Sequence, residues 1–389
     1  MPVSAFLRLT LILAVLALLC GCQNPPEPGP NYREFAYVTN GGNDTVTVID
    51  LRVLRVAATV HVGKGPTGIA TNPTKNEIYV ANTDSNNISV IDAESNKVVS
   101  TIGVHRAPFF VDVSADGNRA YVANSGSANL SVIDLNQRKV IRTIEVGNGS
   151  NLARSTRDGK LVLVTLRNED SVAVIDADKL SVRGKVKVCA KPEEMGLLPD
   201  ASKAFITCGA SDQVAVVDLK NDSLLALLDV GKTPAYIAVK PDGGEVFVCN
   251  FNSSSVSEII TNSNEVNGSF LIGSQPVRAL VSPDNTLLFV SNFGSDSVAV
   301  YSIDNGKRIG SADVGSHPEA MALSPNQLLL LVVNTASGDL TALELTDSKG
   351  QPRAENGQPR TQVFPVATMI PLGKSPRAIV VKAFVSQRY

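Results

Sequence analysis

The sequence repeats itself every 42 residues, and this period constrains the fold more than any other feature. An asparagine, an acidic and a proline column recur at the same spacing: Asn40, Asn82, Asn124, Asn250, Asn292 and Asn334; Asp50, Asp92, Asp134, Asp176 and Asp218; Pro66, Pro108, Pro192, Pro234, Pro276 and Pro318. Only the last unit breaks the period, through an insertion around 348–362 that delays the final proline to Pro376, 16 positions later than the period predicts. The repeat therefore indicates one repeat domain rather than several unrelated domains.

Each repeat unit predicts four short strands. In the second unit, alternating apolar and β-branched residues predict strands over 68–71, 77–81, 88–91 and 98–104. The segments between them are rich in Asn, Asp, Gly and Pro, which are turn-forming residues. Four strands of about five residues, with connections of similar length, use about forty residues. That is the length of one β-propeller blade, so the predicted fold class is all-β.

The two ends of the repeat region predict how the ring closes. The region begins at a second strand, 35–40, and finishes with an unpaired first strand, 376–382. We expect this C-terminal strand to complete the blade that the N-terminal strand begins, which leaves no blade edge open at the junction. Counting first or second strands predicts eight blades over residues 35–384, followed by a tail at 385–389.

The recurring Tyr-Val-Thr-Asn run, with its Val-x-Val-Ile-Asp partner, resembles the YVTN family of bacterial and archaeal β-propellers. The resemblance covers residues 35 to about 384. Because seven blades are common among YVTN proteins, a seven-bladed ring remains the alternative. A WD40 propeller is disfavoured, since the chain has no tryptophan.

The N-terminal segment is typical of an exported protein. An apolar stretch after Arg8 is too short to span a bilayer and has the length of a signal-peptide core. The run Leu19-Cys20-Gly21-Cys22 resembles a bacterial lipobox, which predicts a signal peptide at 1–21 and lipidation of Cys22. We expect residues 22–34 to form a Pro-rich tether. The resemblance to lipoproteins implies an outer-membrane location if the host is Gram-negative, because Gln23 stands where that family's inner-membrane members carry Asp. The alternative is an ordinary signal peptide with two incidental cysteines.

Composition narrows the classes of partner. The formal net charge is −2, whereas nucleic-acid binding needs a basic surface, so no nucleic-acid partner is expected. Cys189, Cys208 and Cys249 form no CxxC motif, and Cys208 and Cys249 occupy strand positions typical of small buried hydrophobes. We expect a monomer with an N-terminal lipid anchor in the membrane.

Function is predicted where the repeat is broken. The repeated Asn and Asp columns are interpreted as turn-formers, because a catalytic site needs a few residues in one place. The connections into the first strands vary most and are expected to share one face around the central channel. The candidate ligand-binding residues there are His105, Arg106, Phe109, Arg154, Glu193, Glu194, Tyr236, Arg278, His317, Glu319 and Arg377. The alternative is a charged rim that only keeps the propeller soluble.

The leading hypothesis is a cell-envelope propeller that binds or scaffolds a protein, glycan or small ligand, without a catalytic residue, metal or cofactor. The insertion at 348–362 is a second candidate contact site. The alternative is a lactonase-like hydrolase or a protein that binds a divalent metal or haem. Glu193, Glu194, Glu319, Asp112 and Asn151 are the residues that would imitate a lactonase site, and His105 and His317 are candidate axial ligands. No GxSxG or HExxH motif occurs.

Overall fold

The computed structural model describes residues 29–345 and 362–387. The predicted signal peptide, Cys22 and nearly all of the insertion lie outside these residues. Two compact units divide the chain: residues 34–383 form one, and residues 1–33 with 384–389 form the other. In the second unit the Ser386 N–H donates a hydrogen bond to the Asn31 carbonyl oxygen at 2.8 Å. No helix among the described residues has the length and hydropathy needed to cross a bilayer.

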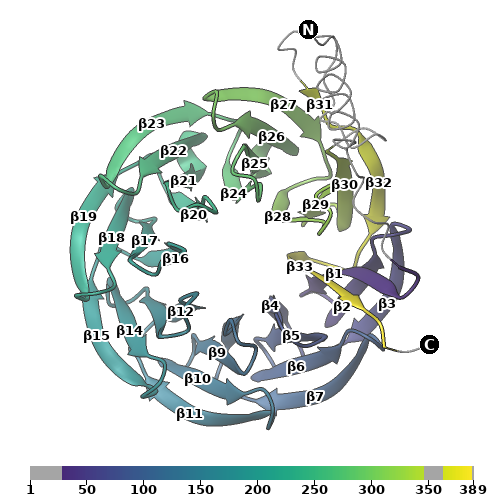
Figure 1. Cartoon of the computed structure of the whole chain (residues 1–389), viewed down its shortest axis with the longest axis horizontal. Helices are drawn as coiled ribbons and strands as arrows, with labels where there is room; N and C mark the ends of the chain where they lie inside the picture. The colour runs from purple at the N-terminus through teal and green to yellow at the C-terminus, as the bar shows by residue number, and fades with distance from the viewer. Residues whose placement is uncertain (1–28, 346–361, 388–389) are drawn as a thin grey trace, which may run out of the picture. The chain divides into compact units, whose positions relative to one another are not determined.

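Residues 34–383 form a β-propeller of eight antiparallel blades around a central channel (Figure 1). From the channel outward, blade 1 holds β33 (Pro376–Val385), β1 (Tyr32–Asn40), β2 (Thr45–Asp50) and β3 (Arg55–His61). Blade 2 holds β4 (Pro66–Thr71), β5 (Glu77–Asn82), β6 (Asn87–Asp92) and β7 (Lys97–Gly103). Blade 3 holds β8 (Pro108–Val113), β9 (Arg119–Asn124), β10 (Asn129–Asp134) and β11 (Lys139–Glu145). Blade 4 holds β12 (Ser150–Ser155), β13 (Leu161–Leu166), β14 (Ser171–Asp176) and β15 (Ser181–Lys187).

The second half of the ring follows the same order. Blade 5 holds β16 (Pro192–Leu197), β17 (Lys203–Cys208), β18 (Gln213–Asp218) and β19 (Ser223–Asp229). Blade 6 holds β20 (Pro234–Val239), β21 (Glu245–Asn250), β22 (Ser255–Ile260) and β23 (Glu265–Leu271), with the short helix η1 (Phe251–Ser253). Blade 7 holds β24 (Pro276–Val281), β25 (Leu287–Asn292), β26 (Ser297–Ser302), β27 (Lys307–Asp313) and β31 (Gln362–Val363), with η2 (Phe293–Ser295). Blade 8 holds β28 (Pro318–Leu323), β29 (Leu329–Asn334), β30 (Asp339–Glu344) and β32 (Val366–Pro371).

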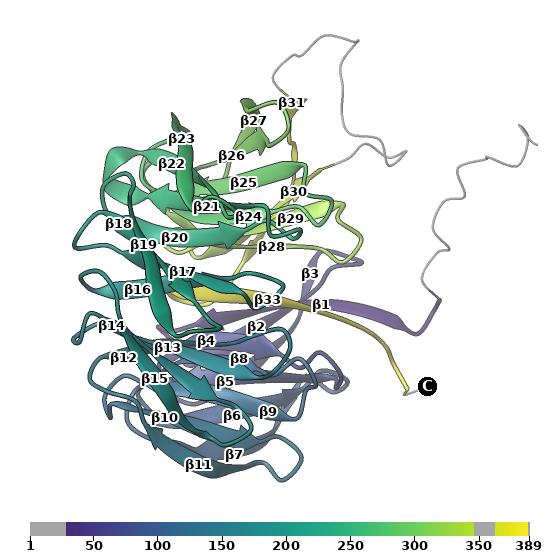
Figure 2. The same cartoon turned by 60° about the vertical axis from the view of Figure 1, so that its left-hand side comes forward.

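The eight-bladed count confirms the prediction and excludes seven. The predicted ring closure is also correct, because β33 joins β1 in one sheet and lies against it in Figure 2. At the junction the Gly41 and Gly42 N–H groups donate to the carbonyl oxygens of Ser375 and Lys374 at 3.1 and 2.9 Å. The strand β1 begins three residues earlier than the sequence pattern predicts.

The hydrophobic core lies between neighbouring blades. One apolar cluster joins Tyr79 and Val90 of blade 2 to Val111 and Ile133 of blade 3. The aromatic residues at the start of the repeated four-residue stretch are at most 2% exposed in six blades: Tyr37, Tyr79, Tyr121, Phe205, Phe247 and Phe289. Burying one such side chain contributes roughly 1.5–3 kcal/mol, and the repeat places one in nearly every blade interface.

The asparagine column is structural, but the predicted reason is wrong. These residues lie in extended strands, as at Asn250 with a φ of −101°, and not in left-handed turns. The buried Nδ2 of Asn82 donates to Asn87 Oδ1 at 2.8 Å and to Ser89 Oγ at 2.9 Å. The asparagine side chains therefore stabilise the connection between the second and third strands through hydrogen bonds. The acidic column does form turns as predicted, since Asp50 Oδ1 accepts the Arg52 N–H at 2.9 Å.

Cysteine pairing corrects another prediction. Cys208 is not a free buried hydrophobe, because it forms a disulfide bond with Cys189 across a Cα–Cα distance of 5.6 Å. Cys249 is free and buried, as the sequence predicts, and burial raises the pKa of its thiol to about 12. No pairing of Cys189 was predicted.

The position of the disulfide follows from the repeat. In five of the other blades a glycine before the first strand packs against the column asparagine. A Cβ added at Gly63 would lie 2.7 Å from the Asn82 side chain, and one at Gly373 would lie 2.6 Å from Asn40. In blade 5 Cys189 replaces the glycine and Cys208 replaces the asparagine. The covalent bond thus takes the place of the glycine–asparagine contact.

Candidate functional site at the channel mouth

The inner strands of blades 2 to 8 turn their variable residues toward the channel through a local irregularity. In blade 2 the pairing jumps from Pro66↔Asn82 to Ile69↔Val80, and similar register shifts follow the first residue of the inner strand in blades 3 to 8. A bulge of this kind frees side chains from the regular alternation of the strand and re-aims them. The residues directly after the repeated proline are therefore the ones that project at the channel mouth.

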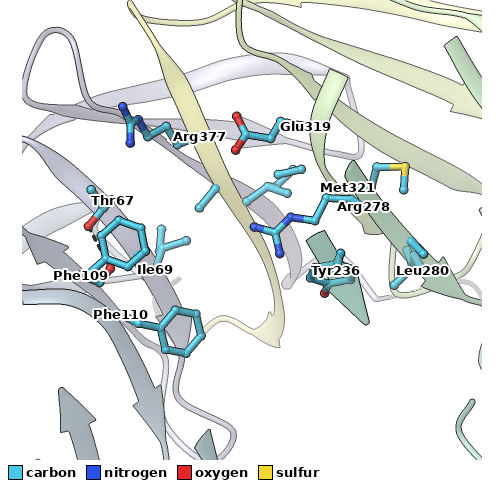
Figure 3. Close-up of a pocket in the computed structure, with 15 residues that line it drawn as sticks. Thr67, Ile69, Phe109, Phe110, Tyr236, Arg278, Leu280, Glu319, Met321 and Arg377 are labelled. Atoms are coloured by element: carbon cyan, nitrogen blue, oxygen red, sulfur yellow. Dashed lines mark hydrogen bonds between the residues drawn. The ribbon is translucent and has the colours of Figure 1, made fainter. Parts of the chain in front are cut away.

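These residues surround a cavity of about 250 Å³. Six inner strands contribute to its walls: β4, β8, β20, β24, β28 and β33. Figure 3 shows Glu319 and Arg377 at one side of the cavity, Phe109 and Phe110 at another, and Arg278 beside Tyr236. The principal lining residues are Thr67, Ile69, Phe109, Phe110, Tyr236, Arg278, Leu280, Glu319, Met321, Arg377 and Ile379.

Small residues create the space. At the second position after the repeated proline, blades 2, 8 and 1 carry Gly68, Ala320 and Ala378, and all three line the cavity. A Cβ added at Gly68 would lie 2.8 Å from the Phe109 carbonyl oxygen, so this wall has no room for a side chain. The equivalent positions in other blades are large, including Phe110 and Tyr236. The cavity therefore lies off-centre, toward the blades with small residues.

A cationic and aromatic cluster adjoins the cavity through Arg278, Tyr236 and Phe110, which line it. Glu194 lies between two arginines: its Oε1 is 2.7 Å from Arg154 Nη2, and its Oε2 is 3.8 Å from Arg278 Nη1. The Arg278 guanidinium lies 4.5 Å from the centre of the Tyr236 ring, and the Arg154 guanidinium lies 5.4 Å from that of Phe110. Cation–π contacts of this geometry stabilise a partly desolvated charge. One carboxylate and two rings thus hold two arginines across the channel.

Burial and the neighbouring carboxylate act in opposite directions on these arginines. Desolvation lowers the pKa of Arg154, but the charge and hydrogen bond of Glu194, together with the charges of Tyr236 and Asp112, outweigh it, so the pKa lies above its ordinary value. The pKa of Arg278 is raised in the same way, by Tyr236 and by the carboxylates of Glu194 and Glu319. Both guanidinium groups therefore stay charged at any physiological pH. Arg154 Nε is buried without a hydrogen-bond partner.

Two further charges face the cavity without an ion-pair partner. Arg377 is exposed and forms no ion pair within 4.0 Å among the described residues. Glu319 Oε2 accepts a hydrogen bond from Thr335 Oγ1 at 3.0 Å, and no cation of the described chain lies within ion-pair distance of either oxygen. The channel mouth therefore presents one free cation and one free carboxylate.

A second cavity, of about 490 Å³, lies further along the inner strands. It shares Tyr236, Ala279 and Leu280 with the first cavity, so the two adjoin each other. Its wall includes Asp112, whose Oδ2 accepts the Ser155 N–H at 2.7 Å and the Ser155 hydroxyl at 2.6 Å. Burial raises the pKa of Asp112 despite these bonds and the nearby Arg154.

The raised pKa of Asp112 predicts a pH-dependent stability. Because the native state binds this proton more tightly, the stability from this group is present below the unfolded pKa of about 3.8 and is lost as pH rises through the folded pKa. In Asp112→Asn, which keeps an oxygen for Ser155, this loss should be absent. Urea denaturation of both proteins from pH 3 upward measures it. Parallel stability curves would contradict the prediction.

The structure brings together some predicted site residues and separates others. Phe109, Tyr236, Arg278, Glu319 and Arg377 line the first cavity, and Arg154 and Glu194 form the adjoining cluster. Glu193 pairs instead with Arg167, and the exposed Arg106 lines neither channel cavity. Sequence analysis missed the small and apolar wall residues, such as Gly68, Ala320, Ala378 and Met321. The signal for them was the change in size down one column of the repeat.

The two histidines do not form a ligand pair at the channel. His105 Nε2 lies 3.0 Å from Thr143 Oγ1 on the outer strand β11, and the His317 ring stacks on Phe293 with centroids 4.2 Å apart. Neither residue lines the two channel cavities. The alternative of axial haem ligation by these histidines therefore does not fit this geometry.

The carboxylates named for a lactonase-type metal site are engaged separately. Glu193 contacts Arg167, Glu194 contacts Arg154, and Asp112 accepts from Ser155. Over residues 29–345 and 362–387, no three or more His, Cys, Asp and Glu side chains are arranged to hold a metal ion. These side chains do not fit a shared divalent cation.

Comparison with known proteins supports the propeller fold. Residues 29–153 match the family model of a YNCE-like beta-propeller, and residues 273–363 match that of a lactonase with a 7-bladed beta-propeller. Each match covers less than half of the chain, and the present ring has eight blades. No curated protein sequence matches significantly.

Solved structures with low sequence identity share the fold. Hydrazine synthase of Kuenenia stuttgartiensis has 19% identity and a TM-score of 0.60, covering 73% of this chain and 97% of its own. The dihydro-heme d1 dehydrogenase NirN in complex with DHE has 13% identity and a TM-score of 0.74, covering 93% and 78%. A proposed 6-phosphogluconolactonase from Bacteroides uniformis has 15% identity and a TM-score of 0.60, covering 90% and 99%. At these identities the likeness concerns the fold alone.

Proposed function

We propose that this β-propeller is an exported, lipid-anchored binding protein that holds a small charged organic ligand at its channel mouth. The observation that carries the proposal is the cavity lined by Arg278, Arg377, Glu319 and aromatic rings, at the positions where the repeat varies. A concave site with an apolar wall and a few convergent polar groups is the usual form of a small-ligand site. Its volume of about 250 Å³ suits a small metabolite better than a polymer segment.

Ala378→Leu tests the binding site directly. The larger side chain enters the cavity, because Ala378 lines it, and should abolish binding without breaking the fold. The matched control is Ala336→Leu, an exposed loop alanine outside the cavity. Thermal-shift measurements with a library of small charged metabolites should give ligands that stabilise the wild type and Ala336→Leu but not Ala378→Leu. A library without any stabilising ligand, or one that stabilises all three equally, would contradict the proposal.

Two sequence features support export and anchoring. The run Leu19-Cys20-Gly21-Cys22 has the pattern of a lipobox. The disulfide bond between Cys189 and Cys208 favours an oxidising compartment, because such bonds rarely persist in a reducing cytosol. We propose an outer-membrane location, because Gln23, and not Asp, follows the lipidated Cys22.

Lipidation at Cys22 predicts a clear difference between two neighbouring cysteines. Cys22→Ala should lose the lipid and leave the membrane fraction, whereas Cys20→Ala should keep both. Metabolic labelling with a fatty acid, followed by membrane fractionation, measures the outcome. Lipid incorporation that survives in Cys22→Ala, or that is lost only in Cys20→Ala, would overturn the assignment.

A lactonase-like hydrolase is the second candidate, favoured by the family match over residues 273–363. That segment contributes Arg278, Glu319 and Met321 to the cavity. Lactone hydrolysis that disappears in Glu319→Gln would favour the enzyme over the binding protein.

A further inference from the structure

The free charges at the channel mouth come from equivalent positions on neighbouring blades. Arg377 follows Pro376 at the start of β33, and Glu319 follows Pro318 at the start of β28. Both residues line the cavity, and Figure 3 shows the Arg377 guanidinium turned away from the Glu319 carboxylate, so that the two form no ion pair within 4.0 Å. Two opposite charges in one cavity, held apart and unpaired, leave room for a ligand that contacts both.

The other charged side chains in this part of the channel contact one another. Arg154 and Arg278 share the carboxylate of Glu194, and Arg278 also lies over the Tyr236 ring. Thr335 occupies only one oxygen of Glu319, so the other remains able to accept a hydrogen bond. A ligand therefore meets one unpaired guanidinium and one unpaired carboxylate oxygen.

The remaining wall is apolar. Ile69, Phe109, Met321 and Ile379 line the cavity, and the Phe109 side chain is 39% exposed toward solvent. An apolar group of the ligand placed here would be removed from water, which favours binding.

We propose that the ligand is a free amino acid with an apolar side chain. This inference rests on the proposed function and names the ligand class of the same cavity. Arg377 binds the carboxylate, for which the planar guanidinium offers two parallel donors. Glu319 accepts hydrogen bonds from the ammonium group, and the apolar wall receives the side chain. The cavity volume of about 250 Å³ accommodates a single amino acid.

Three matched probes separate the two charged contacts. We would titrate the full chain by calorimetry with L-phenylalanine, with phenethylamine, which lacks the carboxylate, and with 3-phenylpropanoate, which lacks the ammonium group; L-leucine, isopentylamine and 4-methylpentanoate form a second series. We expect the amino acid to bind about 10-fold or more tightly than either analogue, because a site built for a charged group leaves that group unpaired when the ligand lacks it.

Two variants assign each contact. In Arg377→Met the amino acid and the amine should bind equally, and in Glu319→Gln the amino acid and the acid should bind equally. Unchanged melting temperatures show that both variants fold; Arg377 is exposed, and Gln keeps the acceptor for Thr335.

Equal binding of the acid and the amino acid to the wild type would overturn the amino-acid inference and leave an anion-binding propeller. The amino-acid inference is also overturned if no probe binds while other metabolites stabilise the protein through the cavity, and the proposed function then stands with a ligand of another class. If no metabolite of the library binds either, the proposed function itself fails.

Discussion

Removing the C-terminal strand should unfold the propeller. A chain that ends at Ser375 lacks β33, so β1 would expose an unpaired inner edge and blade 1 would keep three strands. Ile379 and Val381 would no longer pack against the core between blades 8 and 1. These losses should exceed ~5 kcal/mol, comparable to the whole stability of many domains, which is about 5–15 kcal/mol.

Circular dichroism and size-exclusion chromatography measure this effect. The truncated chain should lose its cooperative thermal transition or aggregate through the open edge. A chain ending at Val385 retains all of β33 and is the matched control. A peptide covering 374–389, added in trans, should restore the transition. A truncated chain as stable as the control would show that the ring does not depend on this closure.

Breaking the disulfide bond between Cys189 and Cys208 should have the second largest effect. The two residues are separated by 19 positions, and cross-linking such a loop stabilises a fold by about 3 kcal/mol. Cys189→Ala with Cys208→Ala should therefore lower the free energy of unfolding by about this amount, and reducing agent should not lower it further.

The glycine and asparagine found at these two positions in other blades offer a replacement for the disulfide bond. Cys189→Gly with Cys208→Asn reinstates the glycine–asparagine contact seen between Gly63 and Asn82. This variant should be more stable than the double alanine variant, because the asparagine packs against the glycine. Urea denaturation with and without dithiothreitol compares them, and Cys249→Ala is the thiol control. A wild type whose midpoint does not change on reduction would contradict the assignment.

The ring could be predicted because the 42-residue period indicates the length of a blade, the order of its strands and turns, and the number of blades. The strands of blade 2 lie within a few residues of their predicted bounds, and the closure followed from the missing first strand before Phe35. The disulfide was missed because each cysteine was considered by itself. The joint departure of Cys189 and Cys208 from the glycine and asparagine columns was the signal.

The candidate site was predicted only in part. Sequence spacing determines which blade a residue belongs to and at which end of the channel it lies, but not which side chains it contacts. Arg278 and Glu319 were expected at the mouth, and they line the cavity there. His317 shares that face, yet its ring stacks on Phe293 and does not line the channel. The cavity itself depends on Gly68, Ala320 and Ala378. These residues carry no functional group, so a sequence search for charged, polar or aromatic residues does not select them.

Equilibrium dialysis tests the central claim, that the varied residues form a ligand site at the channel mouth. The wild type and Ala378→Leu would be dialysed against a small-molecule extract of the host cells, and the retained compounds identified by mass spectrometry. We expect the wild type to enrich one or a few small compounds with both an ammonium and a carboxylate group, and Ala378→Leu to enrich none of them. Identical profiles for the two proteins would contradict the claim and leave the channel mouth as a charged rim.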